Sequence, residues 1–111
     1  MQIIRGTTPT IKINIKSDID LSKVAQVWVY ISQRSVCKVD KKIEDVEIVV
    51  ADKQIKVRLS QEDTLALRAE EAMFQIRMLL DDETALATVA NKVTVIEVYK
   101  GGVITEVVTN E

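Results

Sequence analysis

Two short acidic segments are the first candidates for chemistry. Asp18 and Asp20 stand two positions apart, and Asp81, Asp82 and Glu83 are consecutive. Paired carboxylates can act as the acid and base of a glycosidase, or bind Ca²⁺. Neither segment has the spaced oxygen ligands and central glycine of an EF-hand, and one Trp, two Tyr and one Phe cannot line a sugar cleft. We therefore interpret both segments as surface turns, which Asp favours.

The absence of histidine removes the commonest general base and metal ligand. With no His and a single cysteine, the chain cannot build a Ser-His-Asp triad, a Cys-His dyad or an ordinary zinc site by itself. Lys38 beside Cys37 would favour a reactive thiolate, but a free cysteine is more often a small buried apolar residue. Gly101-Gly102 does not precede a helix, so no phosphate loop is indicated. We expect no enzymatic activity, catalytic residue, metal or cofactor.

Charge and hydropathy restrict the partners. The chain has 15 Lys and Arg against 17 Asp and Glu, interleaved along its length, with a formal net charge of −2. Nucleic-acid binding requires a basic surface, so we expect no nucleic-acid partner. The first residues lack the pattern of a signal peptide, and no apolar run is long enough to span a bilayer, so we expect no membrane association. One cysteine cannot form an intramolecular disulfide, so the core must hold the fold.

The composition is that of a strand-rich domain. Val and Ile number 29 against 7 Leu, and 9 Thr bring the β-branched residues to 38 of 111. This length fits one domain, and we expect residues 1–111 to form it. The strands and loops of this domain must position any functional residue.

Apolar residues alternate with polar ones in several segments, as in half-buried strands. The clearest are residues 11–15, 55–59 and 72–80, and residues 46–50 and 93–98 are further strands. Residues 103–108 follow Gly101-Gly102, so we expect them to return beside 93–98 as a hairpin. The residues expected to be buried in the core are Ile13, Trp28, Val57, Phe74 and Ile76.

Residues 60–68 break the strand pattern. Ser60 is suited to cap a helix, and Asp63 follows three residues later as in a capping box. We expect a short helix of about two turns that covers one end of the domain and carries the chain from one sheet to the other. With seven or eight short strands, this predicts an antiparallel, immunoglobulin-like β-sandwich with one short helix.

Residues 27–31 are apolar on both faces of their strand. If Val27, Val29 and Ile31 face the core, Trp28 and Tyr30 point the other way. The short helix could cover these two aromatic residues, or another chain could. We favour the second alternative, because Trp and Tyr are frequent interface anchors. Trp28 and Tyr30 are therefore the candidate interface residues.

Five short motifs follow one another along the chain. They are Arg5-Gly6-Thr7-Thr8-Pro9, the strand end Ser32-Gln33, Gln61-Glu62-Asp63-Thr64, Gln75-Ile76-Arg77 and Leu86-Ala87-Thr88. In this order they resemble a family of small, uncharacterised proteins encoded by phages and prophages of Gram-positive bacteria. The resemblance covers nearly the whole chain. This chain departs from the family at residues 69–72, where a glycine-containing turn is usual.

The resemblance implies a structural role, related to the phage tail or baseplate, in place of an assigned activity. The expected function is a non-enzymatic structural or assembly module whose partner is itself or another phage structural protein. The expected location is the host cytoplasm during assembly, or the virion. The alternative is a small module that binds a ligand or a host-surface glycan through loops at one end of the sandwich.

Overall fold

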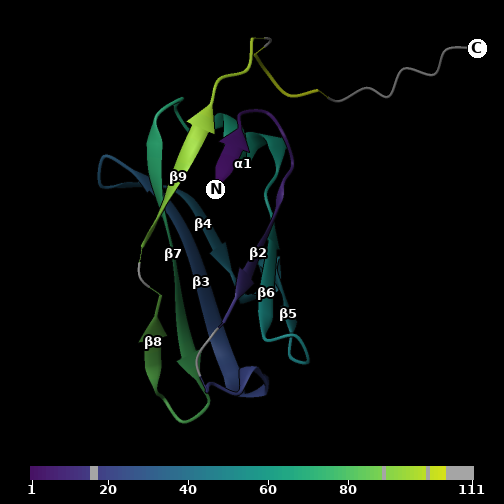
Figure 1. Cartoon of the computed structure of the whole chain (residues 1–111), viewed down its shortest axis with the longest axis vertical. Coiled ribbons are helices and arrows are strands. Elements are labelled where there is room, and N and C mark those ends of the chain that lie inside the picture. The colour runs from purple at the N-terminus through teal and green to yellow at the C-terminus, as the bar shows by residue number, and fades with distance from the viewer. Residues whose placement is uncertain (16–17, 89, 100, 105–111) are drawn as a thin grey trace, which may run out of the picture.

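Alternating apolar segments pair into two sheets that face each other across a core (Figure 1). The computed structural model describes residues 1–15, 18–88, 90–99 and 101–104. The strands of the larger sheet are β1 (Gln2–Ile4), β3 (Val24–Gln33), β4 (Val36–Lys42), β7 (Glu71–Leu80), β8 (Ala85–Ala87) and β9 (Asn91–Ile96). The strands of the smaller sheet are β2 (Thr10–Asn14), β5 (Val46–Val49) and β6 (Gln54–Arg58).

Strand order makes β3 and β7 the centre of the larger sheet. Its order is β1-β9-β7-β3-β4, and the smaller sheet has the order β2-β6-β5. Every pairing in the two sheets is antiparallel within the described residues, except that β1 runs parallel to β9. β8 and β9 pair with successive parts of β7 and follow it in the chain. The predicted immunoglobulin-like sandwich is confirmed.

The core lies where the inward faces of both sheets meet. Val57, Phe74 and Ile76 are buried there as predicted. Ile13 is only partly buried, because β2 is an edge strand and Ile13 packs at the margin of the core. The prediction is wrong for Trp28, which is partly exposed. Val27 and Val29 face inward with no exposed area, so alternation places Trp28 on the outer face of β3.

The predicted helix is present as α1 (Gln61–Leu65), although with five residues it is shorter than the expected two turns. The Ser60 hydroxyl accepts a hydrogen bond from the Asp63 backbone N–H at 3.1 Å, and the Ser60 backbone N–H donates to the Asp63 carboxylate at 2.8 Å. This reciprocal capping box satisfies helix N–H groups that have no partner within the helix. As predicted, α1 carries the chain from the smaller sheet to the larger one.

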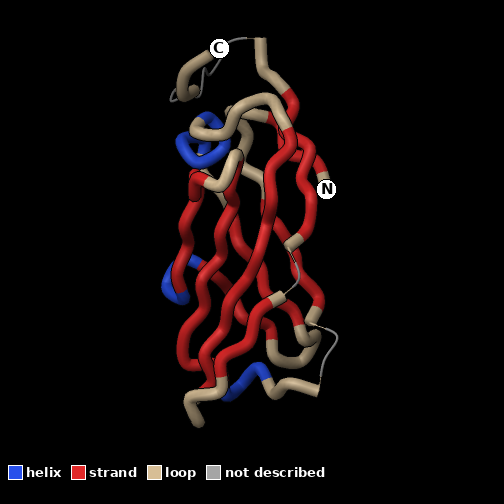
Figure 2. The backbone as a smooth tube through the Cα atoms, turned by 90° about the vertical axis from the view of Figure 1, so that its left-hand side faces the viewer, coloured by secondary structure: helices blue, strands red, loops and turns tan. Residues whose placement is uncertain are grey.

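Two short 3₁₀ helices make other passages between the sheets. They are η1 (Leu21–Lys23), which leads into β3, and η2 (Ile43–Asp45), which leads from β4 to β5. In Figure 2, α1 and η1 lie at opposite ends of the sandwich, with η2 at its side. The two sheets are thus tied at both ends and along one edge.

The predicted C-terminal hairpin is absent where the structure describes it. Residues 103 and 104 are not in a strand, and residues 105–108 lie outside the described residues. Along β9, residues 91–94 pair with β7 and residues 94–96 pair with β1. The predicted return is therefore not seen in residues 103 and 104, the part of it that the structure describes.

Phe74→Ala should lower the free energy of unfolding by about 3 kcal/mol or more, because it leaves a cavity in the core. Met73→Ala is the matched control, since Met73 is the neighbouring residue on the exposed face of β7. We expect the control to change the free energy of unfolding by about 0.5 kcal/mol or less. Chemical denaturation measures both changes, and equal effects would contradict this register.

Asp63→Asn should destabilise the protein in a pH-dependent manner. Burial opposes ionisation of this carboxylate, but hydrogen bonds from Lys41 and Ser60 outweigh burial and lower the pKa of Asp63. Its ionised form therefore stabilises the fold above the pKa of the unfolded chain, about 3.9, and this stabilisation is lost as the pH falls through the lower folded pKa. The expected cost at pH 7 is about 1–2 kcal/mol.

Denaturation of both proteins from pH 7 to pH 2.5 measures this effect. The difference between wild type and Asp63→Asn should shrink below about pH 4, as wild-type Asp63 becomes protonated. Asp52→Asn, at an exposed turn residue, serves as the control and should change stability by about 0.5 kcal/mol or less. A difference that is constant with pH would rule out a role for the Asp63 charge.

Candidate functional site

The first of the five motifs, residues 5–9, connects β1, α1 and the chain after β9. The Arg5 guanidinium forms an ion pair with Glu97 and donates a 3.1 Å hydrogen bond to the Leu65 carbonyl at the end of α1. Gly6 has φ +78°, which a residue with a side chain rarely adopts. The chain thereby turns from β1 toward β2, and these residues have a structural role.

Side chains of two other motifs also hold backbone groups. The hydroxyl of buried Thr64 donates to the Thr7 carbonyl at 2.9 Å. The side-chain amide of buried Gln33 donates to the Arg68 carbonyl at 2.8 Å and accepts from the Arg68 backbone N–H at 2.8 Å. It also reaches the Glu70 carbonyl at 3.3 Å. Gln33 thus fixes the loop between α1 and β7.

The last two motifs join β7 to the chain that follows β8. Gln75 donates from its amide to the Thr88 carbonyl at 2.8 Å, and the Ile76 backbone N–H donates to the Thr88 hydroxyl at 3.1 Å. Across the five motifs, the polar side chains that make these bonds satisfy backbone groups between elements. The motifs therefore encode the fold, and the site must be sought elsewhere.

The two acidic segments are exposed turns, as the sequence predicts. Asp20 caps η1, and hydrogen bonds from the Ser22 side chain and backbone lower the pKa of Asp20. Bonds from the Thr84 side chain and backbone lower the pKa of Asp82 in the same way. Within residues 1–15, 18–88, 90–99 and 101–104, no three His, Cys, Asp or Glu side chains are grouped so that they could hold a metal ion.

Cys37 is exposed, so the expectation of a buried cysteine is wrong. It lies in β4, an edge strand of the larger sheet, where a register shift opposite Ile31 and Ser32 interrupts the alternation. Partial burial of its sulfur atom, together with the nearby Asp40 carboxylate, raises the pKa of the Cys37 thiol. The raised pKa disfavours the reactive thiolate.

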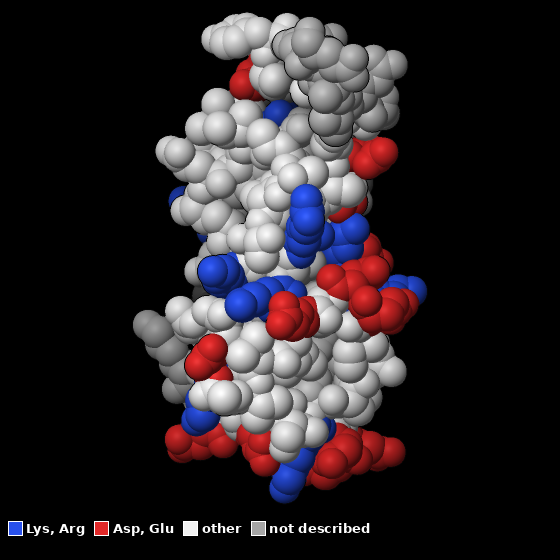
Figure 3. Space-filling view, turned by 90° about the vertical axis from the view of Figure 1, so that its right-hand side faces the viewer, with Lys and Arg blue, Asp and Glu red and all other residues white. Residues whose placement is uncertain are grey.

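The outer face of the smaller sheet is charged. Lys12 and Lys56 are cross-strand partners on this face, and Glu47 pairs with Lys56 on its other side. Figure 3 shows the corresponding side of the molecule, with basic and acidic side chains mixed across its middle. Mixed charges of this kind are typical of a solvated surface.

The outer face of the larger sheet is different, because it carries two of the three aromatic residues outside the core, Trp28 and Tyr30. Trp28 lies between Lys42 of β4 and Arg77 of β7, and Tyr30 lies one step further along β3. A cavity of about 190 Å³ is lined by residues that include both aromatic side chains. We name this surface the aromatic face and define it by Trp28, Tyr30, Arg77, Leu79 and Ala85.

The helix does not cover the aromatic face. The Lys41 ammonium forms a 2.7 Å ion pair with Asp63 of α1. Lys41 is the cross-strand partner of inward-facing Val29, so α1 lies on the core side of the larger sheet. Trp28 and Tyr30 are on the opposite side. The sequence left two alternatives for what covers these aromatic residues, the short helix or another chain, and the position of α1 excludes the helix.

Sequence reasoning identified the two aromatic residues but not their neighbours. Arg77 and Leu79 were recognisable as outward-facing residues of a strand, since they alternate with Ile76 and Met78. Their position beside Trp28 depends on the β3–β7 register. That register is a long-range property with no local sequence signal.

Comparisons with known proteins agree on the fold alone. No family model and no curated protein matches the chain. The chain is similar to the crystal structure of CopC from Methylosinus trichosporium OB3b, with a TM-score of 0.53 and 10% identity, over 90% of this chain and 87% of that chain. A match to the V domain of amphioxus IgVJ-C2 has a TM-score of 0.34 and 8% identity, over 86% of this chain and 99% of that chain.

The class defined by the fold is therefore an immunoglobulin-like β-sandwich, and Trp28 and Tyr30 lie half-buried on the outer face of its larger sheet. At 10% identity the likeness to CopC shows the architecture and carries nothing about ligands. Among the described residues, no helix is long and apolar enough to cross a membrane.

Proposed function

We propose that this chain is a non-enzymatic structural or assembly module that binds a protein partner through the aromatic face. One observation carries the proposal: Trp28 and Tyr30 lie together on the outer face of the larger sheet, whereas the strands of the smaller sheet contain no aromatic residue. Aromatic residues on a rigid sheet can bury a large area with little loss of side-chain freedom. They are suited to anchor an interface.

The surroundings of the two aromatic residues favour a protein over a small molecule. The adjoining cavity of about 190 Å³ is smaller than the roughly 300–1,000 Å³ usual for ligand sites. Lys42 and Arg77 flank Trp28 in the sheet register, and Asp40 and Gln75 flank Tyr30. An apolar centre with polar neighbours is the usual anatomy of a protein interface.

The five motifs support a phage or prophage origin, with a place in the tail or baseplate. Their polar residues hold the loops of this fold, so a chain sharing all five in the same order would share the fold. On this proposal the partner is a second copy or another phage structural protein. The chain then acts in the host cytoplasm during assembly or in the virion.

A ligand-binding module is the second candidate. The indole of Trp28 beside the guanidinium of Arg77 offers a stacking surface and hydrogen-bond donors, which suit a sugar. In this second candidate function the binding site lies on the sheet face and not in the end loops expected from the sequence. Sugar binding and protein association can be distinguished, because a sugar would bind at the same residues without joining copies of the chain.

Purified protein should contain no stoichiometric zinc and show no metal-dependent or nucleophilic hydrolase activity, because the chain has no His and its one thiol has a raised pKa. Elemental analysis and generic ester and peptide substrates measure this. Recovery of one tightly bound zinc per chain would overturn the non-enzymatic part of the proposal.

Trp28→Ser and Tyr30→Ser should each weaken binding to the partner at least tenfold, since truncating an interface anchor costs about 2 kcal/mol or more. Light scattering over a concentration series measures self-association, and co-purification from phage-producing cells measures binding to another tail protein. Neither residue is in the core, so both variants should remain folded, and chemical denaturation with circular dichroism checks this.

Val49→Ser is the matched control, because Val49 is similarly half-buried but lies on the outer face of the smaller sheet. It should leave association unchanged. Loss of association in Val49→Ser but not in Trp28→Ser would place the interface on the smaller sheet and contradict the proposal. Constant monomer mass, together with no co-purifying protein, would refute the interaction role.

A further inference from the structure

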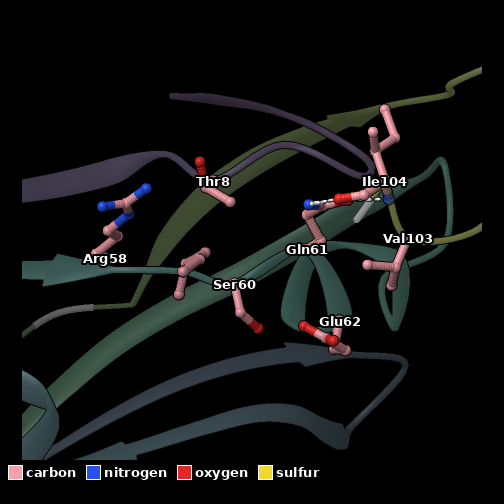
Figure 4. Close-up of a pocket in the computed structure, with 8 residues that line it drawn as sticks. Thr8, Arg58, Ser60, Gln61, Glu62, Val103 and Ile104 are labelled. Carbon is pink, nitrogen blue, oxygen red and sulfur yellow. Dashed lines mark hydrogen bonds between the residues drawn. The ribbon is translucent and has the colours of Figure 1, made fainter. Parts of the chain in front are cut away.

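An open groove lies at the α1 end of the sandwich, apart from the aromatic face (Figure 4). It has a volume of about 510 Å³ and extends between Thr8, Arg58 and the first residues of α1. Val103 and Ile104 also line it, and Ile104 is 43 positions after Gln61 in the chain. A segment from the C-terminal part of the chain is therefore part of the groove.

The Gln61 side-chain amide binds the backbone of this segment with one donor and one acceptor, as the backbone of a neighbouring β-strand would. Its side-chain amide donates to the Ile104 carbonyl at 2.8 Å, and the Ile104 backbone N–H donates to the Gln61 side-chain oxygen at 2.7 Å. Figure 4 shows this pair of bonds. Both involve the backbone of Ile104, so Gln61 recognises an extended chain and places no demand on its side chains.

Few other contacts hold the segment. Gly101 and Gly102 precede it, with open space around both and φ +86° at Gly102. In the described part of the chain, the structure gives no backbone hydrogen bond from Tyr99 or residues 101–103 to the rest of the domain. Val103 and Ile104 remain 41% and 64% exposed although they are apolar. We name residues 101–104 the arm.

We propose that the arm is exchangeable: Ile104 of one copy pairs with Gln61 of a second copy, and reciprocal exchange joins the two copies. The two hydrogen bonds are the same within one copy and between two, so exchange costs little beyond association itself. Exchange also brings a second copy close to Val103 and Ile104, whose apolar side chains are partly exposed within a single copy. The glycines supply the change of direction that exchange needs.

Protein concentration decides between the two arrangements. A short connection gives an effective concentration on the order of millimolar for the contact within one copy. Exchange is therefore expected at high protein concentration or where copies are held side by side. This proposal concerns the groove alone and does not depend on the aromatic face.

Two variants that are defective in complementary parts test the exchange. Gln61→Ala keeps the arm but loses its receptor, and Ile104→Pro keeps the receptor but lacks the N–H that donates to it. In sedimentation across about 0.01–1 mM, wild type should form a dimer, and each variant alone should associate at least tenfold more weakly. An equimolar mixture should recover part of the association, because one intact arm meets one intact receptor.

Gln54→Ala is the control, since the Gln54 amide also makes a side-chain bond, to Asn14, but away from the groove. It should dimerise as wild type does, and Trp28→Ser should retain whatever association the arm produces. Circular dichroism confirms that each variant is folded. A wild-type monomer throughout this range, or no recovery in the mixture, would overturn the exchange without bearing on the aromatic face.

Discussion

The passage of the chain between its two sheets is the constraint on which this structure depends. Within the described chain this passage occurs four times: before β2, before β3, between β4 and β5, and through α1. Backbone groups at such passages have no strand partner and need another one. Gln33, Thr64 and Arg5 supply it for the passages at the α1 end. Packing of Val and Ile alone would leave those groups unsatisfied.

The residues that hold the fold together are therefore different from those available to contact a partner. The side chains that satisfy backbone groups are buried or point between elements, and they account for the motifs that are easiest to see in the sequence. Trp28 and Tyr30 belong to no motif bond of this kind and lie on the outer face of the sheet. The motifs therefore identify residues that hold the fold together, and they do not identify Trp28 and Tyr30.

The sequence was informative where local chemistry decides the outcome. Alternation identified β6 and β7, and the Ser60–Asp63 pair identified α1, because side-chain period and capping are short-range effects. It was misleading where a contact between distant segments decides the outcome. Gly101-Gly102 indicates a hairpin turn, yet residues 103 and 104 are not in a strand, and Ile104 is hydrogen-bonded to Gln61 of α1. Such contacts, like the position of Arg77 beside Trp28, are set by pairing across the whole chain.

The parallel pairing of β1 with β9 has a mechanical consequence. Tension applied at the two ends of the chain would pull β1 and β9 in opposite directions along their common axis. The Gln2–Thr94, Ile3–Val95 and Ile4–Ile96 pairs would then be loaded together in shear, and could not open one after another as in a zipper. The Arg5–Glu97 ion pair lies directly beyond the last of them and joins the same load path. The termini of this sandwich thus form a clamp against stretching.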